Sequence, residues 1–292
     1  MSQTHHVTST GDTVTKTYTD RSRGEDQREW TALRVISTAR PGLVPVPLRL
    51  TGATLTMTRL PGTPLAGELT AQQLDGLETA LRDLWSIPPA SLAPVDHPAL
   101  VARIRADLQH SPTGETTAAG AGPPPEASRA GAVGECWRSG PRQDLLREAR
   151  QVALDWLDGD EAAELARPAN AVIGHGDPNL ANYLWDGVRV RIVDFEDAGR
   201  SDLAYELGTL VEHLASRGTR WDGFAERFGV DAARFRAARC LWASFWLTMV
   251  GPGGPAAERN PPGTGVRQAA RVLELIRPGG EATPGGTGRR GC

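Results

Sequence analysis

The most informative part of the chain runs from Gly174 to Glu196 and reads GHGDPNLANYLWDGVRVRIVDFE. The turn dipeptide Asp186-Gly187 separates two apolar runs, a pattern that predicts a tight β-hairpin. Because a hairpin brings its two ends together, we expect Asn182, just before it, and Asp194, just after it, to lie close in space. Asp177 precedes the hairpin on the adjoining loop and is expected near both side chains.

Two carboxylates and one amide oxygen that converge on one point suit a hard cation. Mg²⁺ prefers oxygen ligands, takes few of them from the protein and shares the rest with water and phosphate groups. The sequence therefore predicts a magnesium site that includes Asn182 and Asp194. The alternative interpretation is a polar loop between strands, in which these two are ordinary turn and strand-end residues.

The order and spacing of these residues resemble the catalytic loop of kinases. There an Asp and an Asn are separated by four residues, and a metal-binding Asp follows the next strand pair. The closest resemblance is to the aminoglycoside phosphotransferase and choline kinase-like family, which has His-Gly-Asp where protein kinases have His-Arg-Asp, and often Asp-x-Glu in place of Asp-Phe-Gly. This resemblance implies an α+β, two-lobed protein kinase-like fold, with a small β-rich N-terminal lobe and a larger, mainly helical C-terminal lobe.

The resemblance also implies a role for each polar residue of the loop. Asp177 is expected to be the catalytic base, and His175 to brace the loop. Asn182 and Asp194 are expected to hold Mg²⁺, with ATP or GTP as cosubstrate. Asp202 begins a strongly apolar helix, so it is expected to cap that helix. The resemblance also implies that it is a buried Asp that hydrogen-bonds the backbone of the catalytic loop.

Lys16 is the only lysine among the 32 basic residues of the chain. It lies in a run of strand character, Thr13 to Tyr18, as does the kinase lysine that contacts the α- and β-phosphates. The helix expected over residues 24–38 places Glu29 on one face with Leu33 and Ile36. An acid on an inward face needs a partner, so Glu29, with Glu25 as the weaker candidate, is predicted to pair with Lys16.

The start of the chain departs from the kinase pattern. Only fifteen residues precede Lys16, and Gly11 is the only glycine among them. We therefore expect a shortened N-terminal lobe without the usual glycine-rich loop, with the turn at residues 8–12 as the cover for the phosphates. Position in the chain places the adenine-binding hinge at three residues, Thr58, Arg59 and Leu60.

The predicted organisation has an N-terminal nucleotide-binding lobe over residues 1–60 and a catalytic and substrate-binding lobe over 61–277. A Gly- and Pro-rich insertion at about 111–141 and a tail at 278–292 carry too little apolar surface to fold alone. Helices are expected near 24–38, from Thr70 onward, and near 98–109, 143–157, 202–214, 221–228, 231–249 and 265–276.

Composition excludes several classes of protein. A net charge of −3 argues against a general affinity for nucleic acid or for anionic membranes. Three scattered cysteines fit no disulfide framework, and no apolar stretch approaches the length of a membrane span. We therefore expect a cytoplasmic protein with no nucleic-acid or membrane partner.

The function predicted is transfer of a phosphoryl group from ATP or GTP to a hydroxyl of an antibiotic-like or other small natural product. A protein substrate is disfavoured because Gly176 replaces the arginine of protein kinases, and because only seven residues separate Asp194 from Asp202. The alternatives are a choline- or sugar-like metabolite kinase, a nucleotide-binding pseudokinase, and a metal-dependent hydrolase that uses His175, Asp177, Asp194 and His213. A cationic aminoglycoside would need an acidic pocket, to which four residues could contribute: Glu206, Glu212, Asp222 and Glu226.

Overall fold

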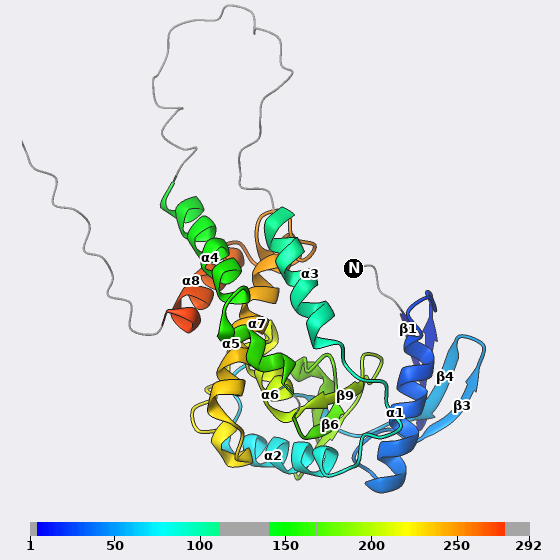
Figure 1. Ribbon diagram of the computed structural model, residues 1–292. Coiled ribbons are helices and arrows are strands. Elements are labelled where there is room, and N and C mark those ends of the chain that lie inside the picture. The colour runs from blue at the N-terminus through cyan, green and yellow to red at the C-terminus, as the bar shows by residue number, and fades with distance from the viewer. Residues whose placement is uncertain (1–4, 111–139, 168, 278–292) are drawn as a thin grey trace, which may run out of the picture.

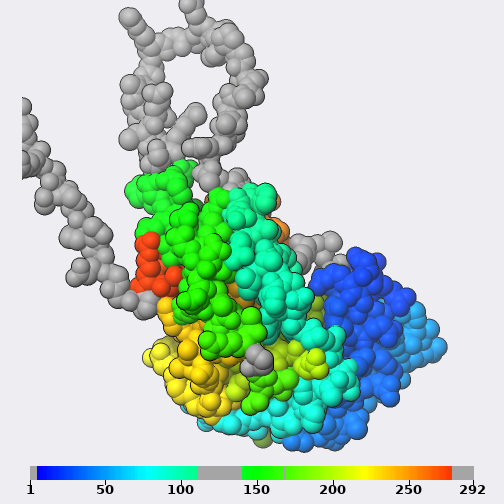
Figure 2. Space-filling view, in the orientation of Figure 1, coloured from blue at the N-terminus to red at the C-terminus, as the bar shows by residue number. Residues whose placement is uncertain are grey.

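The computed structural model describes residues 5–110, 140–167 and 169–277. All but the last two residues of the predicted insertion, and the whole predicted tail, lie outside the described residues. The described part has a small N-terminal lobe, dominated by one sheet, beside a larger helical lobe (Figures 1 and 2).

The N-terminal lobe is built on a four-stranded antiparallel sheet of order β1-β2-β4-β3. Lys16 lies on β2, which matches the run of strand character from Thr13 to Tyr18, and it is paired with Val7 on one side and Leu55 on the other. One helix, α1, packs against this sheet (Figure 1). The elements are β1 (His5–Thr10), β2 (Thr13–Tyr18), α1 (Glu25–Ala39), β3 (Pro47–Thr51) and β4 (Thr54–Thr58).

Helix α1 follows the predicted pattern of burial. Glu29, Leu33 and Ile36 lie on its inward face, and each is at most 1% exposed. Because two apolar neighbours anchor that face, the Glu29 carboxylate is held inside the lobe, beneath the β2 strand.

The C-terminal lobe contains most of the helices, joined by short two- and three-stranded sheets. The helix expected from Thr70 onward is α2, and Thr70 begins it with a capping box in which both hydrogen bonds to Gln73 are formed. The helices are α2 (Ala71–Trp85), α3 (His97–His110), α4 (Pro141–Leu157), α5 (Asp160–Ala163), α6 (Leu203–Glu212), α7 (Ala232–Val250) and α8 (Thr264–Ile276).

The short strands of this lobe surround the stretch at 174–196. The predicted hairpin forms β7 (Tyr183–Trp185) and β8 (Val190–Ile192), and its β7 strand also pairs with β5 (Thr63–Pro64). A separate pair joins β6 (Ala171–Gly174) to β9 (Gly199–Asp202), so the chain on both sides of the hairpin is fixed.

One predicted helix is wrong. Residues 221–228 contain only a short 3₁₀ turn, η4 (Ala225–Phe228). Gly223 adopts a positive φ of 71°, which interrupts the helical path directly after Asp222. The aromatic residues of this segment still fulfil the predicted packing role, since Phe224 is buried in the core.

Two groups of buried apolar residues hold the described chain together. The first extends from the N-terminal sheet and α1 through α2 to the β7–β8 hairpin, and the second lies among α3, α4, α7 and α8. The first group therefore crosses the junction between the lobes. Among the described residues, the helices are too short or too polar to cross a lipid bilayer.

Candidate active site

Lys16 is the centre of a buried ion cluster. Its Nζ lies 2.8 Å from Glu29 Oε2 and 2.8 Å from Glu196 Oε2, and it also contacts Asp194 Oδ1. Burial alone lowers the pKa of Lys16, but attraction to the three carboxylates outweighs it and places the pKa above its usual value. Lys16 therefore stays charged, 4% exposed, between α1 and the end of the hairpin.

Glu29 links the N-terminal lobe to the predicted metal-binding segment. Its Oε2 accepts hydrogen bonds from Lys16 and from the Tyr18 hydroxyl, and its Oε1 accepts one from the Phe195 amide at 3.2 Å. The weaker sequence candidate, Glu25, pairs instead with Arg23 at 2.9 Å. Burial and then the charge of Glu29 raise the pKa of Tyr18, so the tyrosine remains a donor.

Asp194 has a backbone conformation that is rare for its residue type. Its φ is 71°, and it is the only non-glycine residue in the described ranges with a positive φ. The preceding residue, Val193, donates its amide to Asn182 O at 2.9 Å, so the two ends of the hairpin meet as the sequence predicted. Strained backbone of this kind persists where surrounding contacts fix it, which Lys16 does here.

Asn182 ends a short 3₁₀ turn, η2 (Leu180–Asn182), that Asn179 caps by accepting a hydrogen bond from Ala181 N at 3.0 Å. The Asn182 amide nitrogen donates to Asp177 O at 3.0 Å. This bond ties the predicted metal ligand to the loop that carries the predicted base, and it leaves the amide oxygen of Asn182 as the atom suited to a cation.

A cavity of about 320 Å³ lies between the two lobes. Apolar side chains such as Val14, Met57 and Leu184 line part of it, which suits the flat face of a nucleobase. The Arg59 amide donates to Asp12 O at 2.7 Å, so the predicted hinge is fixed to the β1–β2 turn. The residues predicted to contact nucleotide or metal all line this cavity: Lys16, Glu29, Thr58, Arg59, Leu60, Asn182 and Asp194.

A trio of potential metal ligands lies at the same place. His5, Asp194 and Glu196 each offer one atom, and these atoms lie within 4.8 Å of one another. His5 Nδ1 lies 3.1 Å from Glu196 Oε2. The carboxylates of Asp194 and Glu196, with the nearby amide of Asn182, form an oxygen-rich set that fits Mg²⁺.

His175 braces the catalytic loop through three hydrogen bonds. Its Nε2 bonds Val193 O at 2.8 Å; since a carbonyl can only accept, the ring proton lies on Nε2. Its Nδ1 accepts the Asp177 amide at 3.3 Å, and its own amide donates to Glu206 Oε2 at 3.0 Å. His175 thus connects the loop to the end of β8 and to α6.

Gly176 has no space for a side chain. Its φ is 83°, and a Cβ added there would lie 2.2 Å from Asp197 O. The loop therefore passes directly against the segment after Asp194. No residue with a side chain, arginine included, fits at this position without moving the loop.

The side chain of Asp177 is accessible to solvent, with 47% of its surface exposed. Its Oδ1 lies 3.4 Å from His213 Nε2. Partial burial raises the pKa of Asp177, but interactions with His213, His175 and the Asn179 amide together lower it by more, so it lies below its usual value. Asp177 is therefore an ionised, solvent-facing carboxylate at neutral pH.

Asp202 caps α6, as predicted, by accepting a hydrogen bond from Tyr205 N at 3.0 Å. Its other partner is the buried Arg234, whose Nη2 lies 2.8 Å from Oδ2. The hydrogen bond that Asp202 was predicted to make to the loop backbone is made instead by Glu206, one turn further along the helix, which accepts from the His175 amide. Asp202 thus supports the loop by fixing the start of the helix that carries Glu206.

Sequence reasoning did not assign their present contacts to three residues of this centre: Glu196, Glu206 and His213. Glu206 could have been found by the criterion that selected Glu29, because it is an acid within an apolar helix. His213 falls within the helix expected over 202–214, whereas it lies at the cap position that follows the last residue of α6. Only the bend of the chain at that cap turns its ring toward Asp177.

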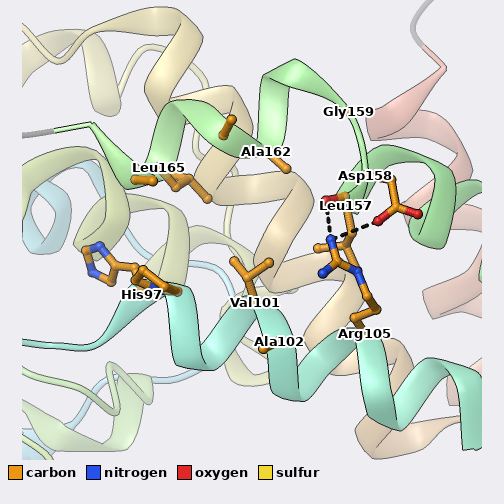
Figure 3. A pocket seen from close by; sticks show the side chains of 12 residues that line it. His97, Val101, Ala102, Arg105, Leu157, Asp158, Gly159, Ala162 and Leu165 are labelled. Atoms are coloured by element: carbon orange, nitrogen blue, oxygen red, sulfur yellow. Dashed lines mark hydrogen bonds and ion pairs between the residues drawn. The ribbon is translucent and has the colours of Figure 1, made fainter.

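A second pocket, of about 350 Å³, lies away from this cleft, between α3 and the α4–α5 connection (Figure 3). Its walls are mainly alanine, valine and leucine side chains. At one end Arg105 Nη2 lies 2.8 Å from both Leu157 O and Asp158 Oδ1, and His97 stands at the other end. None of the residues of the ion cluster or catalytic loop lines it.

Comparison with solved structures identifies the fold. A choline/ethanolamine kinase family protein from Mesorhizobium loti has a TM-score of 0.60 at 18% identity, covering 95% of this chain and 86% of that chain. The choline kinase LicA from Streptococcus pneumoniae has a TM-score of 0.58 at 12% identity, with 94% and 90% covered. For the ADP-bound aminoglycoside phosphotransferase APH(2'')-Ib these values are 0.55, 15%, 93% and 94%. The chain thus has the predicted two-lobed, protein kinase-like α+β fold.

Sequence comparison identifies the family. No curated protein matches the chain significantly. The sequence model of the phosphotransferase enzyme family matches residues 2–242, which include Lys16, the catalytic loop and most of α7. The chain therefore belongs to the phosphotransferase enzyme family.

Proposed function

We propose that this phosphotransferase transfers the γ-phosphoryl group of ATP or GTP to a hydroxyl group of a small natural product, with an antibiotic-like compound as the leading candidate. The observation that carries the proposal is the cavity between the lobes. It is lined by Lys16, Asn182 and Asp194 and also by the predicted hinge, Thr58 to Leu60, and the ionised Asp177 adjoins it through Asn182.

In the proposed reaction each residue acts on a defined group. Lys16, Asn182 and Asp194 bind the triphosphate end of the nucleotide, and Thr58 to Leu60 contact its base. Asp177 orients the acceptor hydroxyl and accepts its proton as the new oxygen–phosphorus bond forms and the bond to the β-phosphate oxygen breaks. General base catalysis of this kind contributes about 10²- to 10⁴-fold to the rate.

Asn182, Asp194 and Glu196 would hold Mg²⁺, which when bound offsets the negative charge of the phosphates. The protein contributes a fixed cation of its own for the same purpose. Because Lys16 is held by three carboxylates, its ammonium is already positioned before nucleotide arrives. The domain assignment we propose, 1–60 for nucleotide and 61–277 for catalysis and acceptor, follows from this division.

The acidic residues considered for a cationic acceptor are only partly available. Glu206 is buried beneath the catalytic loop. Glu212 is 0% exposed and pairs with Arg239 and Arg271, each at 2.8 Å. A strongly cationic acceptor would therefore have to rely on Asp177 and on residues other than these two. This favours a weakly charged or neutral hydroxylated compound over an aminoglycoside.

The proposal is tested by nucleotide consumption in the presence of Mg²⁺ and a panel of hydroxylated antibiotics and metabolites, with mass spectrometry of the product. An Asp177→Asn variant is expected to lose about 10²- to 10⁴-fold in kcat while binding nucleotide as the parent does. If the parent protein binds nucleotide but phosphorylates no compound, the pseudokinase alternative is favoured. Turnover of a choline- or sugar-like compound alone would favour the metabolite kinase.

A further inference from the structure

The histidine that approaches Asp177 is fixed in one tautomer by its own position in the chain. His213 follows the last residue of α6 and adopts extended backbone, with φ −58° and ψ 140°. Its Nδ1 accepts a hydrogen bond from Ala215 N at 3.1 Å, which caps the short turn η3 (Leu214–Ser216). Because Nδ1 is an acceptor, the proton of the neutral ring lies on Nε2.

The protonated nitrogen faces the carboxylate of the predicted base. His213 Nε2 lies 3.4 Å from Asp177 Oδ1, and a carboxylate can only accept at that oxygen. The histidine is 7% exposed and Trp246 packs against its ring at right angles, with the centroids 4.9 Å apart. A rigid donor thus meets a side chain that is 47% exposed.

An exposed aspartate has freedom about its χ1 and χ2 angles that a catalytic base must lose. The backbone of Asp177 is held by His175 and Asn182, but neither bond restrains its carboxylate. The contact between His213 Nε2 and Asp177 Oδ1 does restrain it. Misplacement of a reacting group by about 1 Å can reduce the rate about 10²-fold.

We propose that His213 is a positioning residue of the phosphoryl transfer, whose Nε2–H holds one oxygen of Asp177 so that the other faces the acceptor hydroxyl. This inference rests on the proposed role of Asp177 as the base. His213 gives up no proton in the reaction and contacts neither nucleotide nor metal. It orients the base, so loss of this contact is expected to lower kcat.

Two substitutions of His213 test separately its contact with Ala215 and its contact with Asp177. In His213→Asn the amide oxygen replaces Nδ1 as the acceptor for Ala215, but the side chain is too short to reach Asp177. In His213→Gln the amide nitrogen can take the place of Nε2 and donate to Asp177, whereas the cap is lost. A purely structural role would make the glutamine variant the more damaged of the two.

The expected result is that His213→Asn lowers kcat about 10- to 100-fold, with KM for nucleotide and the melting temperature near those of the parent. His213→Gln should recover part of that loss. His110→Asn, at the exposed end of α3, serves as the control and should leave both constants unchanged. A kcat of His213→Asn within twofold of the parent, or a glutamine variant no better than the asparagine one, would overturn the proposal.

A second measurement keeps this test separate from the proposed function. In ¹⁵N-histidine-labelled protein at neutral pH, the His213 signals should show protonated Nε2 and unprotonated Nδ1, and Asp177→Asn should shift the Nε2 resonance while Nδ1 changes little. A proton on Nδ1, or no response to the substitution, contradicts the inference even if no acceptor is ever found. Absence of turnover together with the expected signals would count only against the proposed function.

Discussion

At the scale of single residues, Gly176 shows how backbone conformation and a close contact can restrict a position to glycine. Its positive φ and the 2.2 Å approach of Asp197 O to a built Cβ exclude any side chain. The sequence itself shows that glycine stands where protein kinases have arginine. It could not predict the cause, because the contact is with a residue 21 positions away.

We predict that Gly176→Ala destabilises the protein and abolishes most of its phosphotransferase activity, since the new methyl group pushes the loop away from Asp197. The matched control is Gly187→Ala in the β7–β8 turn, where φ is 97° but no atom lies within 4 Å of a built Cβ. Both substitutions strain φ, at a cost of about 1–2 kcal/mol, and only the first meets a neighbour. We therefore expect Gly176→Ala to lose more unfolding free energy, measured with urea, and more kcat than Gly187→Ala. Equal losses in the two variants would mean that backbone strain at φ alone causes the effect.

At the scale of elements, α6 acts as the support of the catalytic loop. Its start is fixed by Asp202 and Arg234, its first turn carries Glu206, and His213 follows its end. Periodicity predicted this helix and its cap. The partners of Glu206 and His213 were beyond sequence reasoning, because both depend on how closely the β6–β9 pair brings the loop to the helix.

The buried Glu206 provides the prediction at this scale. Burial raises its pKa above the usual value of 4.5, although the neighbouring Ser201 hydroxyl and the hydrogen bond from the His175 amide oppose the change. The folded state therefore binds this proton more tightly than the unfolded state, so its contribution to stability is complete at low pH. That contribution is lost as pH rises from about 4.5 through the raised value.

In Glu206→Gln the side chain still accepts from the His175 amide but no longer titrates. We expect the free energy of unfolding of the variant to gain on that of the parent as pH rises from 4 to 7, because only the parent carries the buried group that loses its proton over this range. Urea unfolding at several pH values measures this. Glu68→Gln, at an exposed position, is the control, and a difference independent of pH would contradict the assignment.

At the scale of the whole molecule, the two lobes meet at the ion cluster and in one continuous apolar core. The motif order in residues 174–196, with Lys16 on an early strand, was enough to predict both lobes and several residues that line the cavity between them, among them Lys16, Asn182 and Asp194. The sequence offered only position as a guide to the hinge. It also gave no sign that β5 would pair with β7, since the two residues of β5, Thr63 and Pro64, are too few to show a strand pattern.

Because Lys16 and Glu29 come from one lobe and Asn182 and Asp194 from the other, nucleotide bound between them should stabilise both lobes together. We predict a single unfolding transition that rises in temperature when Mg²⁺ and ATP or GTP are added, by an amount equivalent to about 2.7 kcal/mol at a hundred times the dissociation constant. Asp194→Asn, or removal of Mg²⁺ by a chelator, should abolish most of the shift. Asp177→Asn should retain it, because that carboxylate faces the acceptor. Calorimetry of the parent, Asp194→Asn and Asp177→Asn measures these shifts in unfolding temperature. If Asp194→Asn keeps the full shift, nucleotide binds without the residues assigned to its metal, and the assignment is wrong.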